Sequence, residues 1–104
     1  MRQARLTEAT LCVLRAFVSA PDRKLSGAQI GRETGMGPGS RYPILKRLEE
    51  AGWLEGQWED IDPCQAGRPR SRLYGLTQLG REEARAALQN RAARVKTVLG
   101  RANV

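Results

Sequence analysis

The 104-residue sequence has no histidine, only two cysteines, and few aromatic side chains: two tryptophans, two tyrosines and one phenylalanine. Without histidine there is no Ser-His or Cys-His nucleophile pair, and the commonest metal ligand in proteins is missing. Two cysteines in a chain of this length do not form a disulfide scaffold, which favours a reducing, cytoplasmic setting. We therefore expect a protein that is not an enzyme and that needs no metal and no cofactor.

Long apolar segments are missing as well. No run approaches the ~18 apolar residues that a transmembrane helix needs, and the opening residues 1–5 lead into no signal-peptide core. The length predicts one hydrophobic core, and the shortage of aromatics predicts that Leu, Val, Ile and Ala fill it.

Positive charge is what the sequence has in excess. Eighteen Lys and Arg residues against eleven Asp and Glu residues give a formal net charge of +7. Such an excess favours a polyanionic partner, with nucleic acid first and an anionic membrane surface second. The membrane alternative is weak, because basic residues interrupt every broad apolar face of the last predicted helix.

The first predicted helix spans Thr7 to Ser19. Thr7 is a suitable N-cap, and one apolar stripe follows at helical spacing. Cys12 lies beside this stripe, and we expect it to be a buried, inert thiol. The stripe consists of Leu11, Leu14, Phe17 and Val18.

Two short helices follow with the spacing of a helix-turn-helix. Ser26 and Gln29 form a capping-box pattern at the start of the first, and Gly35 is a suitable C-terminal glycine. The second begins near Pro38 and ends at Gly52, with Ile44, Leu45 and Leu48 as its buried stripe. Pro43 inside it removes one backbone hydrogen bond, so either the regular helix starts near Ser40 or its first turn is bent; we favour the bend.

After Gly52 the periodicity changes to that of strands. Residues 53–59 and 70–76 predict a β-hairpin with a long polar tip, and residues 24–26 predict a short third strand. Trp53 is expected in the core, whereas Trp58 either packs there by default or lines a ligand site. Cys64 is expected to be exposed in the tip. The fold class is therefore mainly α with a small β-wing: a winged helix-turn-helix followed by a C-terminal helix.

The last helix is predicted from its cap at Thr77 to about Leu99. Its apolar residues step by four and three, which is the spacing of a coiled-coil seam and indicates pairing with a second subunit. This interpretation divides the chain into a DNA-binding domain, residues 1–76, and a dimerisation helix, residues 77–104. The predicted dimerisation residues are Leu88, Ala92, Val95 and Leu99, and the seam ends at Ala102.

Two groups of basic and polar residues fit a DNA interface. An α-helix in the major groove presents the side chains of its N-terminal turns to base edges, and a basic hairpin can follow the flanking phosphates. A solvated basic surface is the alternative in both places. The helix supplies Ser40, Arg41, Tyr42 and Lys46, and the hairpin supplies Arg68, Arg70 and Arg72.

Two segments resemble a known family. Residues 40–54, SRYPILKRLEEAGWL, are similar to the recognition helix of PadR-type transcriptional regulators, and GRPR at 67–70 with YGLT at 74–77 resembles their wing. The resemblance implies a dimer paired through C-terminal helices, repression as the usual output, and release by an effector in some members. It also implies that Tyr42, Arg68 and Arg70 face DNA. The chain resembles the short subfamily with one terminal helix and departs from the family in its extended acidic wing, residues 59–65.

We therefore interpret the chain as a sequence-specific regulator that binds double-stranded DNA as a homodimer and represses transcription. The half-sites should lie about 10 bp apart. The alternative is a winged-helix protein-interaction module, such as an antirepressor or a polymerase-binding factor, that does not read DNA.

Overall fold

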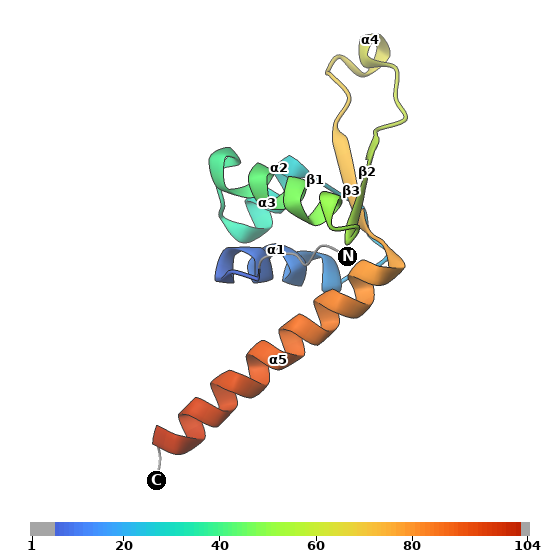
Figure 1. Cartoon of the computed structure of the whole chain (residues 1–104). Helices are drawn as coiled ribbons and strands as arrows, with labels where there is room; N and C mark the ends of the chain where they lie inside the picture. The colour runs from blue at the N-terminus through green and yellow to red at the C-terminus, as the bar shows by residue number, and fades with distance from the viewer. Residues whose placement is uncertain (1–5, 103–104) are drawn as a thin grey trace.

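The structure, a computed structural model, describes residues 6–102, with side chains described as far as Val95. The chain folds as helices at one end, a projecting hairpin and a long terminal helix (Figure 1). In chain order the elements are α1 (Glu8–Val18), β1 (Leu25–Ser26), α2 (Gly27–Thr34), α3 (Pro38–Glu50), β2 (Leu54–Trp58), α4 (Pro63–Ala66), β3 (Arg72–Leu76) and α5 (Gln78–Ala102).

The helix caps are those that the sequence predicts. Thr7 caps α1 by accepting a hydrogen bond from the backbone N–H of Thr10 at 3.2 Å. Ser26 and Gln29 form the complete capping box of α2. Gly35 ends α2 in the left-handed conformation, with φ of 74°, which costs glycine no steric strain. The helix-turn-helix prediction is thus confirmed at its boundaries.

Helix α3 begins at Pro38, so the alternative in which it starts near Ser40 is wrong. Pro43 lies inside the helix, five residues after its first residue. The predicted stripe of Ile44, Leu45 and Leu48 is buried, and it turns the opposite face of the helix toward solvent.

The three strands form one antiparallel sheet in the order β1-β3-β2. Strands β2 and β3 pair from Leu54 opposite Leu76 to Trp58 opposite Arg72, and the chain beyond this pair projects away from the helices (Figure 1). The wing is defined here as residues 54–76. Its tip contains the short helix α4, which the sequence analysis did not predict, capped by Asp62 and opened by Pro63.

The core lies between α1, α2, α3, the base of the sheet and the first turns of α5. Phe17 and Leu14 are fully buried there, and Trp53 is buried as predicted, with 6% of its surface exposed. Two expectations for α1 need correction. Cys12 is exposed rather than buried, because Val13 takes the inward position beside it, and Val18 is only partly buried.

Helix α5 joins this core before it leaves the body of the molecule. Thr77 caps it by accepting a hydrogen bond from Gly80 N–H at 2.9 Å, and Ala84 and Ala87 are buried. Contact with α1 extends to an ion pair of 2.6 Å between Glu8 and Arg91. Beyond this point α5 projects alone to Ala102, three residues past the predicted end (Figure 1).

Along the predicted seam of α5, Leu88 packs against the edge of the core, whereas Ala92 and Val95 are exposed. The side chains of Leu99 and Ala102 lie outside the described set. Within residues 6–102, no helix combines the length and apolar character that a membrane span requires.

Candidate nucleic-acid interface

The exposed face of α3 carries three of the predicted contact residues. Ser40, Tyr42 and Lys46 are exposed, and Tyr42 keeps 45% of its surface accessible. Because Ile44 and Leu45 are buried, Ser40 and Lys46 lie on the solvent side of α3, whereas the ring of Tyr42 lies across Gly27 of α2 and is only partly exposed. The helix thus presents a hydroxyl group, part of an aromatic ring and an ammonium group to solvent.

Arg41 differs from its neighbours because its side chain is folded back on the protein. Its Nη1 donates to the carbonyl oxygen of Met36 at 2.8 Å, and its guanidinium lies 5.1 Å from the centre of the Tyr42 ring. The side chain is therefore half-buried between α3 and the turn that precedes it. Sequence reasoning placed Arg41 among the DNA contacts and did not foresee this partner.

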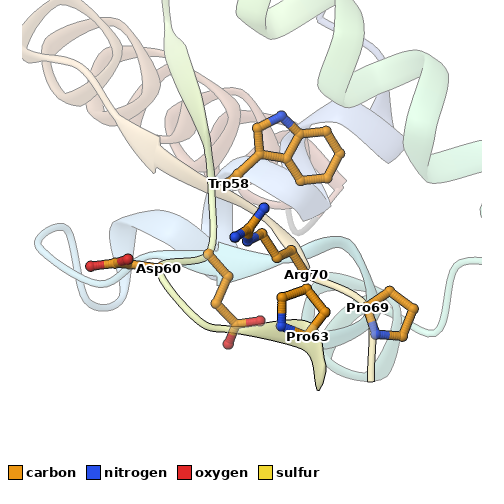
Figure 2. Close-up of a pocket in the computed structure, with 6 residues that line it drawn as sticks. Trp58, Asp60, Pro63, Pro69 and Arg70 are labelled. Carbon is orange, nitrogen blue, oxygen red and sulfur yellow. The ribbon is translucent and has the colours of Figure 1, made fainter. Parts of the chain in front are cut away.

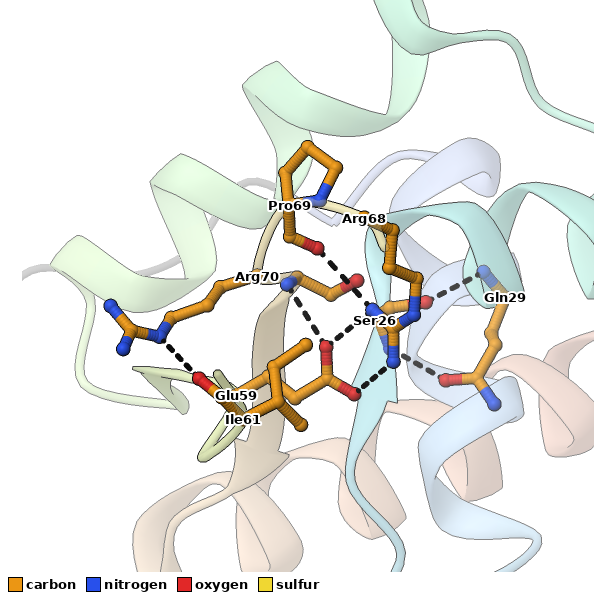
Figure 3. A network of polar contacts seen from close by, with 8 residues as sticks. Ser26, Gln29, Glu59, Ile61, Arg68, Pro69 and Arg70 are labelled. Carbon is orange, nitrogen blue, oxygen red and sulfur yellow. Dashed lines mark hydrogen bonds and ion pairs between the residues drawn. The ribbon is translucent and has the colours of Figure 1, made fainter. Parts of the chain in front are cut away.

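In the wing, Arg68 and Arg70 bind other groups of the same hairpin (Figure 3). Arg68 donates two hydrogen bonds to the Glu59 carboxylate, at 2.6 and 2.8 Å, and Glu59 also accepts from Ser71 N–H at 3.2 Å. Arg70 donates through Nε to the carbonyl oxygen of Ile61 at 2.9 Å. The positive charge of Arg68 is thus paired, whereas Arg70 meets only a neutral carbonyl through that bond.

Arg72 links the wing to α3. Its Nη2 donates to Glu49 Oε2 at 3.2 Å, and its guanidinium stacks 5.3 Å from the centre of the Trp58 ring. Gly56 leaves the space for this arrangement, because a Cβ there would meet Arg72 Nε at 2.8 Å. The same corner raises the pKa of the neighbouring Tyr74 hydroxyl, first through burial and then through the charge of Glu49.

The acidic partners of these arginines are what the sequence analysis missed. In the sequence, no acidic residue lies between Arg68, Arg70 and Arg72. Glu59 and Glu49 reach that run from the opposite strand and from α3. The strand register could have predicted the Glu59 partner, because pairing Trp58 with Arg72 brings Glu59 beside Ser71.

The ion pair in the wing predicts a low titration midpoint for Glu59. Hydrogen bonds from Arg68 and then from Ser71 N–H lower the pKa of Glu59 from 4.5 to about 2. A lowered folded-state pKa stabilises the wing fully above pH 4.5, and this contribution is lost as the pH falls through about 2. We expect the carboxyl ¹³C shift of Glu59 in NMR spectra to titrate near pH 2.

The matched control is Arg68→Gln, which removes the charged donor and keeps a polar side chain. In this variant the Glu59 midpoint should move up toward 4.5. A Glu59 midpoint that is the same in both proteins would show that the ion pair does not form in solution.

An open hollow lies on the wing beside Trp58 (Figure 2). Trp58 is 62% exposed, so its default placement in the core is wrong; it occupies the last paired position of β2 and lies against the Arg72 guanidinium. The lining includes the apolar rings of Pro63 and Pro69, two carboxylates, Glu59 and Asp60, and one guanidinium group, Arg70.

The sequence matches a model of the family described as "Transcriptional regulator PadR-like family" over residues 27–86, which include α2, α3 and the whole wing. The match thus covers both groups of predicted contact residues. A comparison with curated protein sequences finds no match.

Several solved structures share the fold. The chain is similar to smu.1704 from Streptococcus mutans UA159, with a TM-score of 0.74 and 22% identity over 97% of this chain and 94% of that one. It is similar to PcaV, a transcriptional regulator from Streptomyces coelicolor solved with its natural ligand, with a TM-score of 0.70 and 24% identity over 90% and 60%. It is also similar to reduced AbfR bound to DNA, with a TM-score of 0.67 and 21% identity over 94% and 69%; AbfR comes from Staphylococcus epidermidis. At these identities the likeness establishes the fold, and it confirms the winged-helix prediction.

Proposed function

The chain belongs to the PadR-like family of transcriptional regulators, and from this premise we propose that it binds double-stranded DNA as a homodimer and represses transcription. The family is one of regulators, in agreement with the expectation that the chain is not an enzyme. The observation that carries the proposal is the exposed face of α3, where Ser40, Tyr42 and Lys46 point to solvent from a helix anchored by a buried stripe.

In the proposed complex, α3 enters the major groove and the wing lies along the flanking backbone. Ser40, Tyr42 and Lys46 are the groove contacts, because they are the exposed members of the predicted set on α3. Arg70 and the exposed part of the Arg68 side chain supply the wing contacts. Arg41 and Arg72, which are held by Met36 and Glu49, support these contacts from behind.

The second half of α5 supports the homodimer. We assign residues 1–76 to the DNA-binding unit and residues 77–104 to the dimerisation segment, and the first turns of α5 in this segment also pack on α1. Past Arg91 the apolar stripe continues through Ala92 and Val95, and nothing else in residues 6–102 covers it. A second copy of α5 would bury this stripe and set two α3 helices about 10 bp apart.

The proposal includes an effector site on the wing. The family resemblance implies release by a small molecule in some members. The hollow beside Trp58 is the candidate place, because its aromatic and proline rings offer apolar contacts next to charged groups.

The test of DNA binding is a gel-shift titration against a random-sequence pool of 40-bp duplexes, followed by selection of the best-bound duplex. If each subunit neutralises about four phosphates, log K should fall with log salt at a slope near −7. Lys46→Gln should reduce the magnitude of the slope by about 0.9 per subunit.

The matched control is Arg85→Gln, which removes the same charge from an exposed position on α5 and should leave the slope unchanged. A folded dimer that shifts no duplex at low salt would contradict the proposal and favour a protein-interaction module. Repression is tested by placing the selected duplex across a promoter, where the protein should lower transcription of a reporter.

A further inference from the structure

Two glycines of α2 make room for the side chains at the start of α3. Gly27 and Gly31 lie four residues apart and therefore on the same face of the helix. A Cβ at Gly27 would meet Tyr42 Oη at 2.5 Å, and a Cβ at Gly31 would meet Arg41 Nη1 at 2.7 Å. We call the surface formed by Gly27 and Gly31 the α2 seat.

Glycine is needed at positions 27 and 31 because neighbouring side chains leave no room for a Cβ, and not because of the backbone conformation there. The positive-φ glycines of the described chain are Gly35, Gly52 and Gly67, so Gly27 and Gly31 adopt conformations open to any residue. Glycine inside a helix is less favourable than alanine. The close approach of Arg41 and Tyr42 is therefore what the two glycines provide.

Arg41 is held on the α2 seat by several contacts at once. It donates to the Met36 carbonyl oxygen at 2.8 Å and stacks over the Tyr42 ring. Its Nε is buried and finds no hydrogen-bond partner among the described residues, which is unfavourable for the folded state. The contacts with Met36 and Tyr42 hold Arg41 in this place despite that cost.

The two side chains on the seat differ in what they offer to solvent. Tyr42 rests on Gly27 and Arg41 on one side and keeps 45% of its surface exposed on the other. Arg41 is half-buried beneath it. The exposed edge of Tyr42 is therefore the part that can reach a base, and Arg41 fixes its direction.

We propose that the α2 seat determines DNA sequence specificity by fixing the orientation of Tyr42, and that Arg41 is a positioning residue rather than a phosphate or base ligand. This inference rests on the proposed DNA-binding function. The two roles differ in which substitutions Arg41 tolerates. A phosphate contact needs only a positive charge, whereas the positioning role needs the planar guanidinium that stacks on Tyr42, so a positive charge alone does not suffice.

The binding test uses the duplex selected with the wild-type protein and the random-sequence pool. Gly31→Ala, Arg41→Ala and Arg41→Lys should each weaken binding to the selected duplex about tenfold, as expected for the loss of one good base contact. Binding to the random pool and the salt slope should stay as in the wild type. Gly31→Ala is the decisive variant, because it displaces the guanidinium and keeps its charge.

Arg32→Ala is the matched control, since it removes a positive charge from the exposed position next to the seat. It should leave the ratio of selected to random binding unchanged. Wild-type affinity in Arg41→Lys, or a salt slope reduced by about 0.9 per subunit in Arg41→Ala, would overturn the inference and make Arg41 a phosphate contact.

A thermal-unfolding cycle tests the seat without DNA. Gly31→Ala should raise the unfolding midpoint in the Arg41→Ala background, where alanine is the better helix former and meets no clash. In the wild-type background the rise should be smaller or reversed. If Gly31→Ala shifts the unfolding midpoint equally in both backgrounds, Arg41 does not pack on the α2 seat and the inference is wrong. If the shifts differ between backgrounds but the protein binds no duplex, only the proposed function is refuted.

Discussion

Replacing Gly80 by alanine is expected to destabilise the folded chain by at least about 3 kcal/mol, the upper end of the cost of overpacking a core. Gly80 is buried in the first turn of α5. A Cβ there would overlap the carbonyl oxygen of Trp53 and lie 2.8 Å from its carbonyl carbon.

Neither segment can move away cheaply from this contact. The same Trp53 oxygen accepts a hydrogen bond from Thr77 N–H at 3.0 Å, and the Trp53 side chain is part of the core. Thr77 in turn caps α5 through Gly80 N–H. An added methyl group must therefore break the junction between the wing and α5 or shift the backbone of both.

The measurement is urea denaturation followed by circular dichroism, at one protein concentration because the proposed dimer would unfold in a concentration-dependent way. Gly39→Ala is the matched control, because an added Cβ at Gly39 would have no neighbour within 4 Å in the described chain. It should be as stable as the wild type or more so. Equal midpoints for Gly80→Ala and the wild type would contradict the packing at this junction.

Replacing Val95 by aspartate is expected to abolish the proposed dimer and, with it, tight binding to the selected duplex. Val95 is 38% exposed in one chain and lies about one helical turn beyond Arg91, which pairs with Glu8 of α1. In the proposed dimer the substitution would bury a carboxylate of each subunit without a partner. Such burial should cost about 3 kcal/mol or more, which weakens association more than hundredfold.

Light scattering coupled to size exclusion at micromolar concentration measures this effect. Asn90→Asp is the matched control, because it adds the same charge at an exposed position outside the seam. It should remain dimeric and bind DNA as the wild type does. A Val95→Asp protein that stays dimeric would show that the two subunits meet elsewhere.

The parts of the fold that local chemistry determines could be predicted from the sequence. A helix N-cap, a glycine that ends a helix and the alternation of a strand each depend on residues close by in the sequence. Thr7, Ser26 and Gly35 lie at the helix ends where these rules place them. Cys12 and Val13 show the limit, because a shift of one residue along a helix decides which side chain is buried, and both fit an apolar face. Helix α4 is too short for its periodicity to be recognised.

The candidate site was predictable as a surface but not as a set of contacts. The sequence indicates which side of α3 faces solvent, since Ile44 and Leu48 define the buried side. It does not indicate where an arginine side chain will go, because the partner can be distant in sequence. Arg72 reaches Glu49, 23 positions away, while Arg41 reaches Met36 through space left by a glycine on another helix.

The contrast between the two tryptophans also gives the protein its own optical reporter. Trp53 is 6% exposed in the core, whereas Trp58 is 62% exposed on the wing and lies against the Arg72 guanidinium. Indole emission depends on contact with water and on nearby charges. Fluorescence from Trp58, isolated by replacing Trp53 with phenylalanine, should therefore respond to events at the wing without any attached dye.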